Sequence, residues 1–267
     1  MRYCGSGIRF RFKRSATSVF LCLSLVLPCF ATFTLDPTFG SGGKVTLAFP
    51  DAFNAYSSSS LRVFIQPSGR ILVGGRFTNR GEQMQMDGVA MVGFTAGGAV
   101  DATFSQVREW RPDAHTTLLD ALMYADGSTL LLSEILRWPV GSATVHAMRR
   151  APNGNPDNIF ASNVRIGPPC CSGQFAARPV QIALRSDGKI LVLIEDGGYF
   201  LYRLNPDGTR DTSFGENGIV RIVFNRVATA SVIQMLALDD GKIVIVGNSG
   251  FEEGARNFFI TRLTETG

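Results

Sequence analysis

Residues 186–194 read Ser-Asp-Gly-Lys-Ile-Leu-Val-Leu-Ile, a tight turn followed by a strongly apolar run. Three relatives of this stretch, each with the same turn glycine and apolar run, stand at 67–73, 125–131 and 239–245. The four turn glycines, Gly69, Gly127, Gly188 and Gly241, are separated by 58, 61 and 53 residues. A nearly constant period of this length predicts an array of small β units.

A second repeated element has the form Asp-x-x-Phe. It occurs four times, at 36–39, 101–104, 157–160 and 211–214. The Asp oxygens suit a calcium ion, but calcium takes about six or more oxygen ligands and each element supplies one acid. An Asp side chain also accepts hydrogen bonds from backbone N–H groups two or three residues on, and a Phe fills space between packed sheets. We therefore expect a structural turn and no metal site.

Each repeat divides into four predicted strands. In the first repeat they are 61–66, 70–74, 89–95 and 106–111, with the turn glycine between the first two. The second strand of each repeat is apolar along its length, as in Ile190–Ile194. A strand without a polar side has both faces covered, so each sheet is expected to pack against a neighbour on each side.

This pattern predicts an all-β protein, a β-propeller of four four-stranded antiparallel blades over residues 32–267. A strand at 43–49 precedes the first complete repeat, and the last repeat ends after a strand at 257–263. Pairing of 44–47 with 258–261 would complete the last blade and close the ring. The alternative is that two chains share one eight-bladed ring, which makes a homodimer the expected assembly.

Three phrases also resemble a known family. Asp-x-x-Phe-Gly, Gln-Pro-Ser-Gly-Arg-Ile-Leu-Val-Gly-Gly at 66–75 and Arg-Leu-Asn-Pro-Asp-Gly at 203–208 are similar to the delta-60 repeat, a bacterial propeller-forming repeat. The resemblance covers residues 35–267 and is strongest in the first and last repeats. It implies an exported or surface-associated propeller and implies no established chemistry.

The first 31 residues have the composition of a signal peptide. They carry five basic residues and no acid, followed by an apolar stretch at 16–27. That stretch is shorter than the roughly 20 residues needed to span a bilayer, so we expect cleavage after Ala31 and no stable membrane insertion. Without the leader, 21 Lys and Arg stand against 22 Asp and Glu. This near-neutral balance argues against a nucleic-acid partner, and the leader predicts a periplasmic, secreted or cell-surface protein.

Cysteine use is consistent with export. Only Cys170 and Cys171 remain after the predicted cleavage. Adjacent cysteines cannot join distant parts of a fold, but in an oxidising compartment they can form a strained vicinal disulfide. The two states, vicinal disulfide and paired free thiols, both stay open from the sequence.

Alignment of the first strands on their turn glycine gives one polar column. Seven residues before the glycine stand Arg62, Asp120, Gln181 and Gln234, between apolar columns on either side. Alternation along a strand places this column opposite the apolar ones. We expect it to line the axial channel and to be the place where a small polar ligand would bind. The guanidinium of Arg62 could then make a bidentate contact with a carboxylate of that ligand. The structural alternative is that Arg62 and Asp120 neutralise each other.

Motifs of enzymes are scarce in the sequence. It contains no Gly-x-Ser-x-Gly elbow, no phosphate-binding glycine loop and no His-Glu-x-x-His. The pair Glu195–Asp196 is expected to lie in a solvated turn. We therefore expect no catalytic residues and no cofactor, and a role as a binding or protein-interaction scaffold for an unknown protein or small polar ligand. The alternative function is a propeller enzyme, a lyase or glycan hydrolase acting at the channel mouth.

Overall fold

The structure is a computed structural model. The residues that it describes are 34–47, 55–80, 85–109, 114–137, 142–160, 164–166, 178–224, 229–250 and 256–267. The strands all belong to the compact unit Leu35–Gly267. The predicted signal peptide at 1–31, Cys170 and Cys171 lie outside the described residues.

The described residues form β-strands joined by turns, without helices. In chain order the strands are β1 Ala55–Ile65, β2 Ile71–Arg80, β3 Gln85–Phe94, β4 Val107–Glu109, β5 Ala114–Met123, β6 Thr129–Arg137, β7 Ser142–Arg150, β8 Val164–Ile166, β9 Arg178–Leu184, β10 Ile190–Glu195, β11 Tyr199–Leu204, β12 Ile219–Ile222, β13 Thr229–Ala237, β14 Ile243–Gly250 and β15 Arg256–Leu263.

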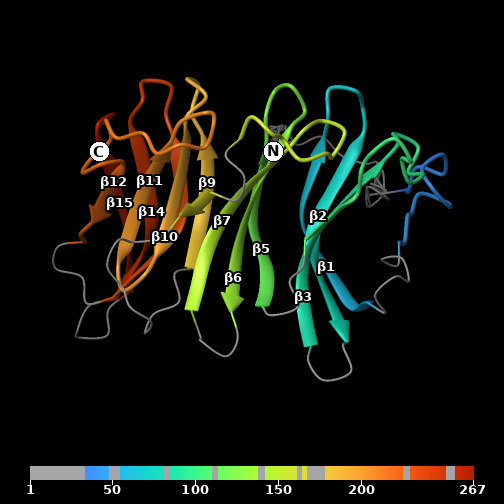
Figure 1. The fold of residues 1–267 in the computed structure, drawn as a ribbon, viewed down its shortest axis with the longest axis horizontal. Helices are drawn as coiled ribbons and strands as arrows, with labels where there is room; N and C mark the ends of the chain where they lie inside the picture. Colours follow the sequence, from blue (N-terminus) through green and yellow to red (C-terminus); the bar gives the residue numbers. More distant parts are fainter. Residues whose placement is uncertain are drawn as a thin grey trace, which may run out of the picture. The chain divides into compact units, whose positions relative to one another are not determined.

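These strands pair into four antiparallel sheets, one for each sequence repeat (Figure 1). We call them the first blade (β1–β4), the second blade (β5–β8), the third blade (β9–β12) and the fourth blade (β13–β15). Within each blade every strand pairs with the next strand in sequence. Successive blades are in contact through β3 and β5, β5 and β9, and β9 and β13. The all-β class and the blade-by-blade arrangement agree with the prediction of a propeller.

The turn glycines take up the backbone conformation that the repeat requires. Gly69, Gly127, Gly188 and Gly241 have φ between 80° and 85°. This left-handed region is open to glycine and strained for residues with a Cβ. The neighbouring Asp fixes the same turn, since the Oδ1 atom of Asp187 accepts from the N–H of Lys189 at 3.1 Å. The repeated glycine is therefore a requirement of the turn between the first two strands of a blade.

The hydrophobic core lies between blades rather than within one sheet. Every residue of Ile190–Ile194 is fully buried, because alternate side chains pack against the second blade and against the fourth. A third cluster joins the first and second blades around Leu72, Met91 and Leu131. This confirms the expectation that apolar strands have both faces covered.

The predicted pairing that would close the ring is not present in this structure. Instead of a strand at 43–49, residues 40–44 form a turn, with an isolated bridge between Gly40 and Lys44. The Gly40 N–H donates to the carbonyl of Gly97 at 2.8 Å, which holds this segment against the first blade. The fourth blade accordingly has three strands, and β15 has one paired edge. No extensive contact joins β1 to β13 in the described part of the chain.

Candidate functional site

The structure brings Arg62 and Asp120 together, as expected. An Arg62 Nη2 to Asp120 Oδ1 distance of 2.7 Å joins the first blade to the second. Asp120 is buried, and its carboxylate also accepts from the N–H of Ala121 at 2.8 Å and from the N–H of Ile182 at 3.0 Å. One carboxylate therefore contacts three successive blades. It faces the neighbouring blade, in contrast to the exposed channel position expected from the sequence.

The two glutamines of the column differ from each other. Gln181 bonds the backbone of Met235 in the fourth blade, donating to its carbonyl at 3.2 Å and accepting from its N–H at 2.5 Å. Gln234 is exposed and makes no hydrogen bond to any described residue. The contacts of Arg62, Asp120 and Gln181 thus join successive blades, and binding of a small polar ligand at this column stays a prediction.

The Asp-x-x-Phe elements are the structural turns that were predicted. In all four, the Asp Oδ1 atom accepts from the N–H two residues on, over 2.8–3.1 Å. Phe104, Phe160 and Phe214 are at most 4% exposed, and Phe39 is half-buried. No cluster of three His, Cys, Asp or Glu that could hold a metal ion occurs among the described residues.

Basic side chains anchor three of these Asp residues, namely Asp101, Asp157 and Asp211. The Oδ2 atom of Asp211 forms ion pairs with Arg203 Nε at 2.6 Å and with Lys189 Nζ at 2.7 Å. Burial by itself raises the pKa of Asp211, but the hydrogen bonds from Lys189, Ser213 and Arg203 outweigh it and hold this pKa well below its usual range. In the first blade, hydrogen bonds from Thr103 and Arg70 lower the pKa of Asp101 to about 2. Both carboxylates stay ionised near neutral pH.

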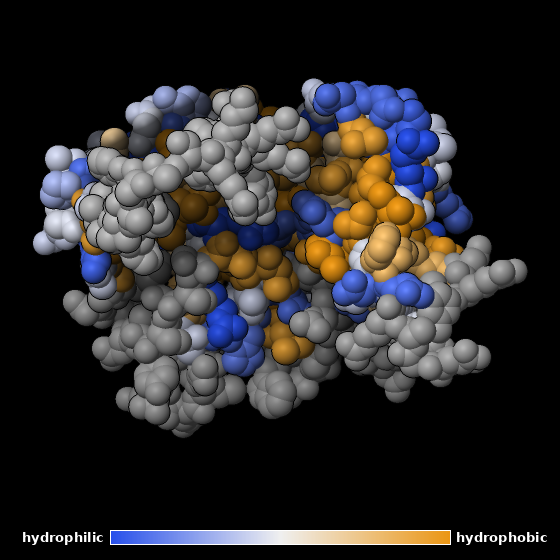
Figure 2. Space-filling view, turned by 180° about the vertical axis from the view of Figure 1, so that it is seen from behind, coloured by the Kyte–Doolittle hydropathy of each residue, from blue (hydrophilic) through white to orange (hydrophobic). Residues whose placement is uncertain are grey.

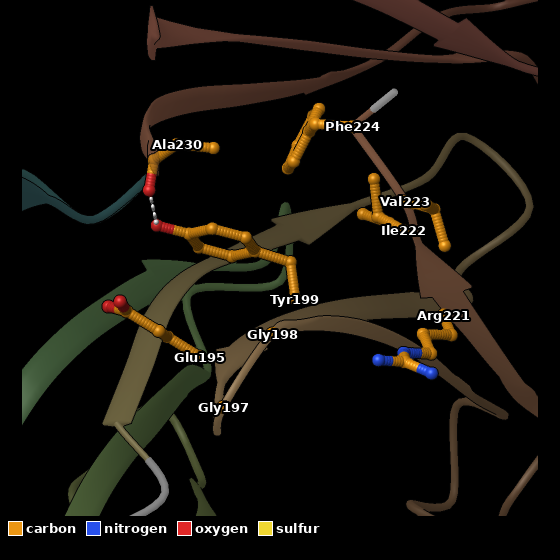
Figure 3. Close-up of a pocket in the computed structure, with 9 residues that line it drawn as sticks. All are labelled: Glu195, Gly197, Gly198, Tyr199, Arg221, Ile222, Val223, Phe224 and Ala230. Atoms are coloured by element: carbon orange, nitrogen blue, oxygen red, sulfur yellow. Dashed lines mark hydrogen bonds between the residues drawn. The ribbon is translucent and has the colours of Figure 1, made fainter. Parts of the chain in front are cut away.

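A cavity of about 430 Å³ opens beside the junction of the third and fourth blades (Figure 3). Its lining comes from the β10–β11 turn, the end of β12 and the start of β13, namely Glu195, Gly197, Gly198, Tyr199, Arg221, Ile222, Val223, Phe224 and Ala230. Tyr199 fixes one wall, because its hydroxyl donates to the Ala230 carbonyl at 3.1 Å and accepts from the N–H of Val232 at 3.2 Å. The ring of Phe224 stands edge-on to Tyr199, with centroids 5.7 Å apart.

Opposite charges line the two sides of this cavity. The exposed side chains of Glu195 and Arg221 stand on either side of the Tyr199 ring (Figure 3). The Gly197–Gly198 turn also lines the cavity, and Tyr199 itself is only 6% exposed. A carboxylate, a guanidinium and aromatic faces together can bind a small molecule that carries both signs of charge and an apolar part.

The expectation of a solvated turn at Glu195–Asp196 is half wrong. Glu195 is exposed, but Asp196 is only 5% exposed, and its buried Oδ1 atom has no hydrogen-bond partner among the residues that the structure describes. Burial raises the pKa of Asp196. Asp196 does not line the cavity, so the two carboxyl groups do not converge there.

The cavity residues were not singled out from the sequence. Tyr199, Arg221 and Phe224 lie outside the repeated phrases, and they meet only because the end of β12 passes beside the start of β13. The sequence signal available was the glycine pair before Tyr199, which departs from the usual hairpin spacing of the repeats.

Comparison with known proteins agrees with the repeat architecture. The family model DUF5122, a domain of unknown function described as a beta-propeller, matches residues 185–214 and 238–267. These two stretches of the chain are similar to β-propeller repeats. Each match begins at a turn of the third or fourth blade, just before the turn glycine. Assignment to the delta-60 repeat in particular stays a prediction, and no curated protein matches the chain.

Solved structures show only distant likeness. A protein of unknown function from Bacteroides caccae is 16% identical, with a TM-score of 0.42 over 79% of this chain and 65% of that one. The GH43 endo-arabinanase from Bacillus licheniformis is 13% identical, with a TM-score of 0.39 over 76% and 72%. The mannose phosphorylase from Leishmania mexicana, in complex with phosphate, is 16% identical, with a TM-score of 0.37 over 79% and 63%. This chain therefore spans less than two thirds of the Bacteroides protein, and TM-scores this low assign no activity.

Proposed function

We propose that the protein is an exported β-propeller that acts as a binding scaffold, and that it binds a short peptide segment in the cavity beside Tyr199. A short peptide carries an ammonium at one end and a carboxylate at the other, which are the two charges that Glu195 and Arg221 complement. The observation that carries the proposal is the placement of these two opposite charges on either side of an aromatic wall in one cavity.

The wall beside the ligand is fixed before binding. Both hydrogen bonds of the Tyr199 hydroxyl go to β13, while the Tyr199 ring belongs to β11. The cavity therefore depends on the junction between the third and fourth blades, and a preformed wall reduces the entropy lost on binding.

Two further parts of the proposal concern location and closure. Export rests on the composition of residues 1–31, and the described part of the chain contains no helix of the length and hydropathy needed to cross a membrane. Closure of the propeller rests on the three-stranded fourth blade, which has room for one more strand at β15.

The glycan hydrolase of the enzyme alternative needs two carboxyl groups facing one substrate position. Glu195 lines the cavity and Asp196 does not. The binding proposal therefore accounts for the cavity with fewer assumptions.

Isothermal titration with a panel of free amino acids, tripeptides and oligosaccharides tests the proposal. We expect at least one tripeptide to bind the wild-type protein, and the Arg221→Ala variant to lose that binding. Arg108→Ala, which removes an Arg from the first blade outside the cavity, is the matched control and should bind as the wild type does. Oligosaccharide binding alone, or peptide binding that survives Arg221→Ala, would refute it.

A further inference from the structure

The fourth blade presents an uncovered apolar face. Phe258 and Ile260 on β15 are 84% and 68% exposed. Their register counterparts in the first three blades are at most 6% exposed, namely Val89, Val145 and Tyr199 for Phe258, and Met91, Ala147 and Leu201 for Ile260. Figure 2 shows hydrophobic side chains gathered over this sheet, on the right in that view. The face has the composition of a blade junction and lacks the following blade.

The first blade presents the opposite half of such a junction. Val63 and Ile65 on β1 are 65% and 68% exposed. The residues in the same column as Val63 pack against the preceding blade and are 6%, 5% and 1% exposed, namely Ala121, Ile182 and Met235. In the described part of the chain, no blade covers this face of the first blade, just as none covers the outer face of the fourth.

Hydrogen-bonding groups match across these two faces. Asp120 and Gln181 each accept a hydrogen bond from the N–H of the residue that follows the polar column in the next blade. Gln234 is the next member of that column and has no such partner among the described residues. If Gln234 accepted a hydrogen bond in the same way, its partner would be the backbone N–H of Val63, the residue that follows the polar column in the first blade.

Charges match as well. Arg203 binds Asp211 at 2.6 Å, and in the second blade Arg149 binds Asp157 at 3.2 Å. Arg262 has the same place on β15, and it makes no ion pair with a described residue. The one Asp-x-x-Phe element without a basic partner is Asp36–Phe39, where Asp36 bonds to Thr38.

We propose that the fourth blade of one chain binds the first blade and residues 35–47 of a second copy of this chain. Gln234 then bonds the Val63 backbone, Arg262 pairs with Asp36, and Phe258 and Ile260 are buried against the partner. Two copies make two identical junctions, which closes one ring of two four-blade halves under two-fold symmetry and leaves no free face. The proposal stands independently of the peptide cavity.

A second copy fits better than closure within one chain. The three junctions inside the chain are already packed around fully buried side chains, and no extensive contact joins β1 to β13 among the described residues. To bring the two free faces of one chain together, all three packed junctions would have to change. A second copy uses both faces as they stand.

Cysteine cross-linking of the purified full chain tests this directly. Combined Val63→Cys and Gln234→Cys substitutions should give a disulfide-linked dimer on a non-reducing gel, with each single variant as the control. A disulfide within one chain, seen as a shifted monomer, would overturn the proposal, as would the absence of any cross-link in a folded protein.

Surface variants supply a second readout. Ile260→Glu should weaken self-association about 30-fold or more, because it places a charge at the centre of the junction. Ile159→Glu, at a residue that is 83% exposed and belongs to no free blade face, should leave association unchanged. Asp36→Arg and Arg262→Asp should each weaken the dimer, and the double variant should recover it. Unchanged association in folded Ile260→Glu, or equal weakening by Ile159→Glu, would refute the assignment.

Discussion

The side-chain amide of Gln181 bonds both backbone polar groups of Met235, so a residue of the third blade completes the hydrogen bonding of the fourth. Met235 is only 1% exposed, and its backbone on this side faces no other strand of its own sheet. The contact explains how two sheets that share no strand pairing are held in register. Asp120 makes the corresponding link to the N–H of Ile182.

Gln181→Ala should lower the free energy of unfolding by about 2 kcal/mol, because it leaves a buried N–H and C=O unpaired. Gln106→Ala, which removes an amide bonded only to the exposed side of Arg108, should change it by less than about 0.5 kcal/mol. Urea denaturation of both variants measures the difference. Equal stabilities would show that the Gln181 contact does not couple the blades.

Asp120→Ala should destabilise the protein more than Arg62→Ala. Asp120 is buried and serves two backbone N–H groups and one guanidinium, so its loss should cost about 3 kcal/mol. Arg62 is 44% exposed, and its removal should cost about 1 kcal/mol. Thermal unfolding of the two variants gives the ranking, and the reverse order would contradict the structural role assigned to Asp120.

Asp211→Ala should lower the free energy of unfolding by about 3 kcal/mol, since it leaves the buried Arg203 without a counter-charge. Asp207→Ala is the matched control four residues earlier; there the Asp is exposed and bonds only to Thr209, and the stability should stay close to that of the wild type. Chemical denaturation at pH 7 distinguishes them.

Low pH should destabilise the protein by protonating the Asp residues of the Asp-x-x-Phe turns. The pKa of Asp101 is lowered from 3.8 to about 2, and that of Asp211 is also lowered. A carboxylate with a lowered pKa in the folded state adds stability above its unfolded pKa and loses it as the pH falls through the folded value. The melting temperature should therefore fall between pH 4 and pH 2, and Asp101→Asn should flatten that part of the profile.

Asp196 should behave in the opposite way. Burial raises its pKa, so the ionised form is disfavoured in the folded state and stability declines as the pH rises above the unfolded pKa. Asp196→Asn should raise the free energy of unfolding at pH 7 by about 1 kcal/mol and have less effect near pH 3. A loss of stability at pH 7 would show that the ionised carboxylate has a stabilising partner.

Much of the fold could be predicted because the repeated residues are required by local backbone conformation and burial. The turn glycine predicts a positive φ, Asp-x-x-Phe predicts a turn with a buried ring, and the unbroken apolar run at 190–194 predicts a strand covered on both faces. The polar column was also found from alternation alone, and the Arg62–Asp120 contact followed from it. These features depend on residues near one another in the sequence or on a fixed period.

The remaining features depend on how distant segments meet. Alternation showed that Gln181 lies opposite the apolar columns, but the backbone groups of Met235 that it bonds are set by the spacing between blades. The cavity beside Tyr199 arises where β12 ends and β13 begins. The strand predicted at 43–49 is not found in its described part, residues 43–47, because the turn at Gly40 binds the first blade through Gly97.

The molar mass of the purified protein in solution, measured by light scattering during size exclusion, tests the central claim that free faces of the first and fourth blades join between chains. The account predicts a single species of twice the chain mass, unchanged on dilution to low micromolar concentration. A species with the mass of one chain, or a series of larger open oligomers, would contradict it.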